Sequence, residues 1–285
     1  MSLARKSRVL FVGGGRRIGL AKKFVEHGAA LYGYEACGEV PLQAFATIIE
    51  GCDFDDPEIA DDLRLVIKKH KITHVVPLMD AATMACGDLP ECIGSSWDAA
   101  RLCYDKSAFA RWMEDRYAAH YPSPGFMRYP KLAKPRFGRS SRGVVELHRP
   151  SIYEWSSDYV VQDYVDGLEV SVDVFLGPVQ AFAVARTRDR VEGGEVVEST
   201  VLGDDAQEIR EASVVICRDM GLRGPVNVQW RADKVIEINA RFGGGCVLTI
   251  ASGLDMVGLC LGKKVKVGAV SVGMTMRRFY SEAYW

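Results

Sequence analysis

The sequence lacks the features that would assign it to a membrane, secreted or nucleic-acid-binding class. No run approaches the roughly 18 apolar residues of a membrane span. The first eight residues lead directly into a strand-like run and carry no signal-peptide core. The chain has 36 Lys and Arg against 37 Asp and Glu, so its net charge of −1 favours neither nucleic acid nor an anionic membrane as a partner. We therefore expect a cytoplasmic protein that binds neither.

Paired cysteines and catalytic triads are also missing. The eight cysteines are scattered, and none forms a Cys-x-x-Cys pair or a zinc pattern with a nearby histidine. We interpret them as reduced, mostly buried thiols. No Ser/His/Asp arrangement, internal repeat or low-complexity tract is present. At 285 residues, 48% of them hydrophobic, the chain is long enough for about two or three compact modules.

The most informative stretch is 224–245, because two runs in it alternate apolar and polar residues with the period of a β-strand. In the first run, one face holds Val226, Val228 and Trp230, and the other holds Asn227, Gln229 and Arg231. In the second, one face holds Ile236, Ile238 and Ala240, and the other holds Val235, Glu237, Asn239 and Arg241. A three-residue turn at 232–234 sets Gln229 opposite Glu237, whereas a two-residue turn would set Gln229 against Ile236. We predict the three-residue turn because it keeps the apolar residues on one side.

This hairpin brings carboxylate and amide oxygens together. Gln229, Glu237 and Asn239 then share one face, and hard cations such as Mg²⁺ bind such oxygens together with phosphate. The alternative is a polar hairpin face that meets water. The wealth of Asn and Gln on this face and the glycine run at 243–245, which suits close backbone approach, favour a binding site.

A family resemblance becomes visible at these residues. Glu237-Ile238-Asn239-Ala240-Arg241 resembles the Glu-Ile/Met-Asn-Pro-Arg signature of the ATP-grasp superfamily, with Ala240 departing from the usual proline. The pattern is most similar to the ATP-binding half of the carbamoyl-phosphate synthase large chain and to small stand-alone carboxylate–amine ligases. The resemblance implies that Gln229, Glu237 and Asn239 hold two Mg²⁺ ions, which Mn²⁺ can replace. It also implies that Arg241 faces the γ-phosphate and an acyl-phosphate.

Further segments resemble ATP-grasp motifs in the same order along the chain. Lys106, after the helix cap Asp105, would reach the nucleotide phosphates. Lys134 would bind the α-phosphate, and the loop after it would close over the β- and γ-phosphates through Gly138, Ser140, Ser141 and Gly143. Without the resemblance, these segments are a capped helix and a basic hairpin loop.

The remaining nucleotide contacts are also implied by the resemblance. The hinge that pairs with the adenine edge would be formed by Gln162, Asp163, Tyr164 and Val165. Glu169 would accept the ribose hydroxyls, because an ionised carboxylate takes two O–H donors well. Arginines at 186, 188 and 190 alternate in a polar stretch, and we choose Arg188 to face the acyl-phosphate. The alternative for the hinge segment is an edge strand with a turn.

The N-terminal segment supports a rival hypothesis. A strand at 8–12, glycines at 13–15 and 19, a helix at 20–27 and a second strand ending at Glu35 form the opening of a doubly wound unit. Such a loop and acid suit NAD(P), although the Gly-x-Gly-x-x-x-Gly spacing departs from the dinucleotide fingerprint. The two arginines after the glycines suit a substrate carboxylate or phosphate equally well. Asp80, just past the strand at 71–78, lies where open α/β sheets place ligands.

Together these patterns predict an α/β fold, α+β in its C-terminal part. We expect a Rossmann-like pre-ATP-grasp domain at 1–103, a small ATP-grasp lobe with the glycine-rich loop at 104–162, and a large lobe with the metal site at 163–285. ATP would lie between two antiparallel sheets. We find no chemistry in 264–285, which we expect to hold a closing strand and a tail.

The predicted function is an ATP-dependent, Mg²⁺-dependent ligase of amino-acid or peptide type that joins a carboxylate to an amine through an acyl-phosphate. It is similar to the carbamoyl-phosphate synthase large subunit, but shorter than that enzyme with its two halves. Its partners are small-molecule carboxylate and amine substrates, with a homodimer left open. The alternatives are an NAD(P)-dependent oxidoreductase and a non-catalytic nucleotide-binding subunit.

Overall fold

The N-terminal part of the chain is a parallel sheet between helices, as predicted. The computed structural model describes residues 7–138, 142–265 and 268–279. Strands β1 (Arg8–Val12), β2 (Ala30–Glu35), β3 (Thr47–Glu50) and β4 (His74–Pro77) pair in the order β3-β2-β1-β4, all parallel. Its helices are α1 (Ile18–Glu26), α2 (Ile59–His70), α3 (Asp80–Cys86) and α4 (Trp97–Tyr104), with a short η1 (Pro41–Ala44). Asp80 opens α3 at the carboxyl end of β4.

A second, smaller lobe follows. Helix α5 (Lys106–Tyr117) is capped by Asp105, whose carboxylate accepts the backbone N–H groups of Ser107 and Ala108. A short η2 (Ala118–His120) follows α5, and η3 (Ile152–Trp155) lies between two of the strands. Strands β5 (Lys131–Pro135), β6 (Val145–Leu147) and β7 (Tyr159–Asp163) form an antiparallel sheet in the order β6-β5-β7.

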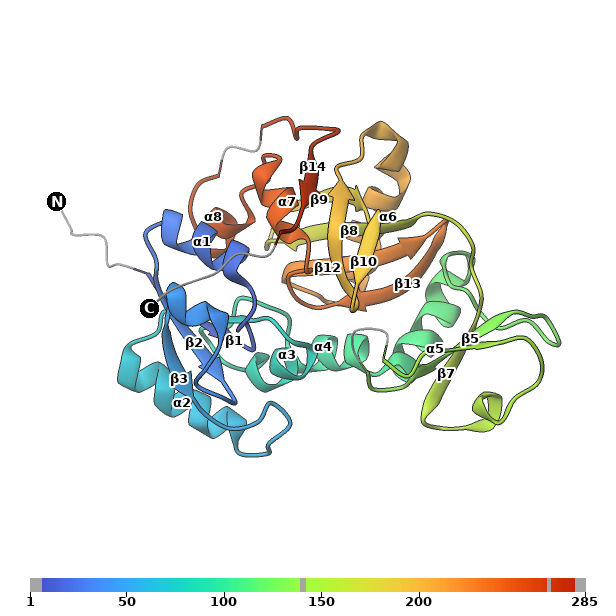
Figure 1. Cartoon of the computed structure of the whole chain (residues 1–285), viewed down its shortest axis with the longest axis horizontal. Helices are drawn as coiled ribbons and strands as arrows, with labels where there is room; N and C mark the ends of the chain where they lie inside the picture. The colour runs from blue at the N-terminus through green and yellow to red at the C-terminus, as the bar shows by residue number, and fades with distance from the viewer. Residues whose placement is uncertain (1–6, 139–141, 266–267, 280–285) are drawn as a thin grey trace.

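The large lobe is built on a second antiparallel sheet, which faces the small lobe (Figure 1). Its strands β8 (Glu169–Leu176), β9 (Ala181–Thr187), β12 (Gly224–Arg231) and β13 (Lys234–Asn239) pair in the order β13-β12-β8-β9. Helix α6 (Gln207–Asp219), after η4 (Asp204–Ala206), packs on this sheet, and the buried Trp230 donates its indole N–H to Ser213 of α6 at 2.8 Å. The mixed α/β fold class predicted from the sequence is thus confirmed.

Two features complete the C-terminal part. The stretch at 186–202 holds strands β10 (Arg190–Glu192) and β11 (Glu195–Thr200), and β11 lies between β10 and β14 (Thr275–Arg277) in a third antiparallel sheet. The segment after the glycine run forms two short helices, α7 (Cys246–Ala251) and α8 (Met256–Cys260). The break is at Gly253, whose φ of +127° is not accessible to a continuing helix.

One hydrophobic cluster joins the beginning and the end of the chain. Phe11 and Phe24 of the N-terminal unit pack in the same cluster as Leu248 and Val257 of α7 and α8, all of them buried. The opposite face of the parallel sheet packs against α2. This packing places α1 against α7, and it brings Arg17, at the end of the glycine loop, close to Gly244, which follows β13.

Candidate active site

The hairpin of β12 and β13 has the predicted register where it matters. Gln229 lies opposite Glu237, and Asn227 lies opposite Asn239. The turn itself was predicted wrongly. Arg231 pairs with Lys234, so the turn contains two residues, and a bulge restores the register further along. The tight turn is possible because Ala232 adopts a left-handed φ of +48°.

The bulge also changes which side chains face the site. Val235 pairs with Trp230, and both are fully buried, whereas Val235 was expected on the polar face. Ile236 is the unpaired residue of the bulge and lines the cavity below, although it was expected on the apolar face. A bulge cannot be inferred from alternation alone, because it interrupts the alternation itself.

A cavity of about 270 Å³ lies between the two antiparallel sheets. The small lobe contributes Leu132 and Lys134 of β5 and Gln162 of β7, while the large lobe contributes Glu169, Gln229 and Glu237. Five more of the predicted site residues line it: Lys106, Gly138, Asp163, Val165 and Arg188. Ser140 and Ser141 lie outside the described residues. Gly143, Tyr164, Asn239 and Arg241 are not among the residues that line this cavity.

Two lysines supply positive charge at one end of the cavity. Lys106 donates to the carbonyl of Gly138 at 2.8 Å, and its Nζ lies 3.8 Å from Oε1 of Glu237. Lys134 donates to the carbonyl of Ile236 at 3.3 Å. Burial lowers the pKa of Lys134, and nearby Glu237 partly offsets this. Both lysines and the single carboxylate therefore converge on one small volume, which suits phosphate groups and a divalent cation.

Glu169 is held between two arginines at the cavity wall. Its Oε1 lies 2.6 Å from Nε of Arg188, and its Oε2 accepts from Arg231 at 3.0 Å. Arg231 was missed as a site residue. The alternation placed it on the same strand face as Gln229, but no motif singled it out.

The hinge segment has one backbone donor that is not engaged. The N–H groups of Asp163 and Tyr164 donate to the carbonyls of Pro122 and Pro130 at 3.0 and 3.1 Å. The side chain of Gln162 is buried and donates to the Tyr121 hydroxyl at 2.7 Å. Within the described part of the chain, the N–H of Val165 has no hydrogen-bond partner, and Val165 lines the cavity, so this hinge donor is available to a ligand.

Asn239 and Arg241 continue the same strand towards the N-terminal unit. Arg241 binds both carboxylate oxygens of Asp80 at 2.8 and 2.9 Å, and it donates to Oδ1 of Asn239 at 3.2 Å. Burial opposes the charge of Asp80, but the Arg241 guanidinium lowers the pKa of this carboxyl below its usual range. Asp80 was expected near a ligand because of its position after β4, and it contacts the predicted phosphate-binding arginine directly.

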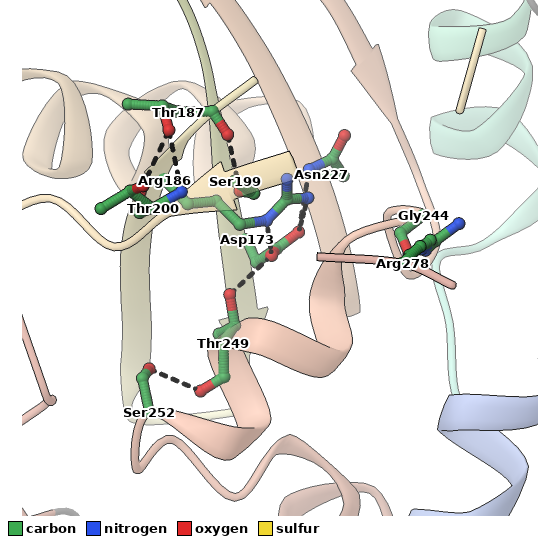
Figure 2. Close-up of polar contacts among 10 residues, drawn as sticks. All are labelled: Asp173, Arg186, Thr187, Ser199, Thr200, Asn227, Gly244, Thr249, Ser252 and Arg278. Carbon is green, nitrogen blue, oxygen red and sulfur yellow. Dashed lines mark hydrogen bonds and ion pairs between the residues drawn. The ribbon is translucent and has the colours of Figure 1, made fainter. Parts of the chain in front are cut away.

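A buried charge network supports this part of the site (Figure 2). Asp173 of β8 and Arg186 of β9 form an ion pair at 2.8 Å, and each side chain is 1% exposed. Asn227 and Thr249 also donate to Asp173, at 2.8 and 2.7 Å. Arg186 is thus an internal structural residue, whereas Arg188 lines the cavity.

The glycine run crosses directly over this network. A Cβ on Gly243 would lie 2.7 Å from the Asn227 side chain, and one on Gly245 would lie 2.5 Å from Nη1 of Arg186. The close backbone approach predicted for these glycines is therefore real. Its partner is the chain's own buried charge pair.

The N-terminal glycine loop does not resemble a free phosphate cradle. The buried carboxylate of Glu35 lies against the backbone of Gly14 and Gly15; burial raises the pKa of Glu35 to about 7, and the amides of these two glycines partly offset the rise. A phosphate would have to displace this carboxylate to use the same amides. This geometry disfavours the NAD(P) hypothesis, in which Glu35 binds a ribose and the amides bind a pyrophosphate.

The metal ligands predicted from the sequence fit a hard cation only together with phosphate. Among the described residues, no group of three or more His, Cys, Asp or Glu side chains is placed to hold a metal ion. Glu237 and Gln229 nevertheless present oxygens to the cavity from opposite positions in one ladder. Such a sparse set suits Mg²⁺ that keeps phosphate oxygens as ligands. No helix within the described ranges is long and apolar enough to cross a membrane.

Comparisons with known proteins agree with this geometry. Residues 156–278 match a family model described as an ATP-grasp in the biosynthetic pathway with the Ter operon. No curated protein matches the chain by sequence.

Solved structures extend the likeness to nearly the whole chain. N5-carboxyaminoimidazole synthetase from Staphylococcus aureus, complexed with ADP, is similar with a TM-score of 0.76 and 15% identity, over 96% of this chain and 82% of that one. An L-amino acid ligase from Bacillus licheniformis is similar with a TM-score of 0.69 and 17% identity, over 90% and 73% of the two chains. Phosphoribosylglycinamide synthetase from Anaerococcus prevotii has a TM-score of 0.67 and 16% identity, over 91% and 76%.

Proposed function

We propose that this member of the ATP-grasp superfamily is an ADP-forming ligase that joins a small-molecule carboxylate to an amine. The observation that carries the proposal is the convergence of Lys106, Lys134 and Glu237 in a cavity between two antiparallel sheets. The solved ligases of the same fold support the reaction class. Amino acids or peptides are the preferred substrates, as the sequence resemblance implies.

The first half-reaction activates the acid. A carboxylate oxygen of the substrate attacks the γ-phosphorus of ATP, the bond to the bridging oxygen breaks, and ADP leaves. Lys106 and Lys134 offset the negative charge on the phosphates, and both side chains are partly buried, where a charge acts more strongly than in water. Glu237 and Gln229, with Asn239, would hold Mg²⁺, which when bound supplies positive charge between the phosphate oxygens.

The second half-reaction forms the C–N bond. The amine nitrogen attacks the acyl carbon, inorganic phosphate leaves, and the nitrogen loses a proton. We assign Arg241 to the acyl-phosphate because it follows Glu237 and Asn239 along the same strand, whereas Arg188 holds Glu169 in place at the cavity wall. Both oxygens of Asp80 orient the Arg241 side chain, so the direction of its guanidinium is fixed.

The nucleotide base and sugar have candidate partners at the other end of the cavity. The free N–H of Val165 is the proposed donor to the adenine edge. Glu169 is the proposed acceptor for the ribose hydroxyls, and Arg188 and Arg231 keep it ionised and oriented.

Thermal unfolding tests the proposal in a first step. The wild type is measured with Mg-ATP, with ATP and a chelator, and with NADH. The same set is run on Glu237→Gln and on the control Glu208→Gln, an exposed residue of α6. A ligand at about 100 times its Kd stabilises the fold by roughly 2.7 kcal/mol, which is several degrees for a unit of this size.

We expect a Mg²⁺-dependent shift with ATP in the wild type and in Glu208→Gln that Glu237→Gln loses. Acid–amine pairs are then screened for ADP release. A shift with NADH that survives Glu237→Gln, without one for ATP, would support the oxidoreductase instead. ATP binding with no ADP release for any pair would leave a nucleotide-binding subunit.

A further inference from the structure

Three arginines from distant parts of the chain meet beside the glycine run. Arg17 follows the N-terminal glycine loop, Arg241 follows β13, and Arg278 follows β14. Their charges act on one another, since Arg241 and Arg278 both lower the pKa of Arg17 after the larger effect of burial. We call Arg17, Arg241 and Arg278 the arginine cluster. Arg278 lies in the segment at 264–285, for which no chemistry was predicted from the sequence.

The carboxylates nearby do not balance this cluster. Asp80 is saturated by Arg241, which takes both of its oxygens. Glu195 lies 3.5 Å from Nη1 of Arg278, but its side chain is 52% exposed, so water screens the pair. In the described part of the chain, no carboxylate lies within ion-pair distance of the Arg17 guanidinium, although this side chain is half-buried. One half-buried positive charge is therefore left without a partner.

The backbone residue between these groups, Gly244, carries no side chain. Gly244 leaves room for Arg17 and Glu195 to approach the same point: a Cβ there would lie 3.3 Å from Nη1 of Arg17 and 2.4 Å from Oε2 of Glu195. Arg278 donates to the carbonyl of Gly244, and Figure 2 shows these two residues together, apart from the Asp173 network. Beside Gly244, the cluster thus has one guanidinium without an ion-pair partner among the described residues and one that is weakly paired.

The arginine cluster lies at the end of the strand that carries the proposed reaction centre. Glu237, Asn239 and Arg241 occupy alternate positions along β13 and its extension. At about 3.3 Å per residue, the Cα atoms of Glu237 and Arg241 are about 13 Å apart at most. A small acid can therefore present one end to the phosphate site and another end to the cluster. A guanidinium pairs with carboxylate and phosphate through two parallel N–H donors, which makes these anions the fitting occupants.

We propose that Arg17 and Arg278 bind a second anionic group of the acid substrate, a carboxylate or a phosphate, at the end away from the reacting carboxylate. The substrate is then at least a dianion, and a simple monocarboxylic acid is a poor substrate. The proposal deepens the proposed function and rests on it for the identity of the reacting group. Binding of the anion itself needs neither ATP nor turnover.

Calorimetric titration without nucleotide tests the site. The probes are inorganic phosphate, succinate and, as a monoanion, acetate, each at constant ionic strength. The variant is Arg17→Gln, and the matched control is Arg16→Gln, the exposed neighbour on the same loop. A parallel titration on Lys134→Gln separates this site from the phosphate-binding lysines of the cavity.

We expect saturable binding of phosphate or succinate to the wild type, to Arg16→Gln and to Lys134→Gln. Arg17→Gln should weaken it roughly tenfold or more, the usual effect of losing hydrogen bonds to a charged group. The tighter of the two probes identifies the anion as phosphate or carboxylate. Arg278→Gln should weaken the same probe, and it serves as the test if Arg17→Gln does not fold.

Equal binding to the wild type and to folded Arg17→Gln and Arg278→Gln would overturn the proposal, as would the absence of saturable binding to the wild type. These outcomes are independent of the ATP experiment. Loss of the Mg-ATP shift with retained anion binding would remove the ligase assignment and leave the anion site.

Discussion

The buried pair of Asp173 and Arg186 offers the sharpest test of how the large lobe is stabilised. Asp173→Asn removes the charge but keeps the shape of the side chain. Arg186 would remain 1% exposed with a full positive charge, and it cannot release its proton at any ordinary pH. The amide NH₂ would also face donors whichever oxygen it replaces, because Oδ1 accepts from Asn227 and Arg186, and Oδ2 accepts from Arg186 and Thr249.

The expected loss is large because one charge of a buried pair stays uncompensated. Removing one partner of such a pair costs about 3–5 kcal/mol. At about 2–4 °C per kcal/mol for units of 150–250 residues, the melting temperature should fall by about 6–20 °C. The reverse change, Arg186→Met, should cost less. Asp173 keeps two donors, from Asn227 and Thr249, and it can also take up a proton.

Urea unfolding and calorimetry of the two variants measure this asymmetry. The double variant Asp173→Leu with Arg186→Met is the control, since replacing both charges by apolar groups is often close to neutral. If Asp173→Asn unfolds within about 1 kcal/mol of the wild type, or if Arg186→Met is the more damaging change, the reasoning about uncompensated charge is refuted.

Two further predictions concern the glycine run and the glycine loop. Gly245→Ala should lower the unfolding free energy by about 1–3 kcal/mol, since its Cβ would lie 2.5 Å from the buried Arg186. Gly244→Ala should cost less, because the half-exposed Glu195 can move away; equal urea midpoints would contradict this difference. Burial raises the pKa of Glu35 from about 4.5 to about 7, so the folded state binds the extra proton between these values. The stability of the wild type relative to Glu35→Gln should therefore fall as pH rises from about 4.5 to 7. An equal difference in urea midpoint between the wild type and the variant at pH 5 and at pH 8 would refute this.

The sequence predicted the residues of the cavity better than the path of the chain around it. Lys106, Lys134, Glu169 and Glu237 were identified from short motifs, and they line one cavity. The turn of the β12–β13 hairpin was wrong, because a bulge changes the register without a local composition signal. Arg231 was passed over because it belongs to no motif, yet it holds Glu169 from the neighbouring strand.

The pairing of charges across the chain was not accessible from the sequence either. Asp80 and Arg241 are 161 positions apart, and their bidentate contact depends on how the N-terminal unit packs against the large lobe. The same holds for Arg186, one of three alternating arginines at 186, 188 and 190. The three arginines are spaced two residues apart, but Arg186 is buried against Asp173, whereas Arg188 lines the cavity.

The sequence by itself determined the fold class, the strand pairing that sets Gln229 against Glu237, and the lysines and carboxylates offered to a nucleotide. These depend on local periodicity and on motifs within a few residues, where the period-2 geometry of a strand fixes which side chains share a face. Only the tertiary structure decided that Glu35 lies against the glycine loop and that, among the described residues, Arg17 has no ion-pair partner. Burial and ion pairing depend on contacts between residues far apart in the chain, and the energy of a charge is set by those contacts rather than by its neighbours in sequence.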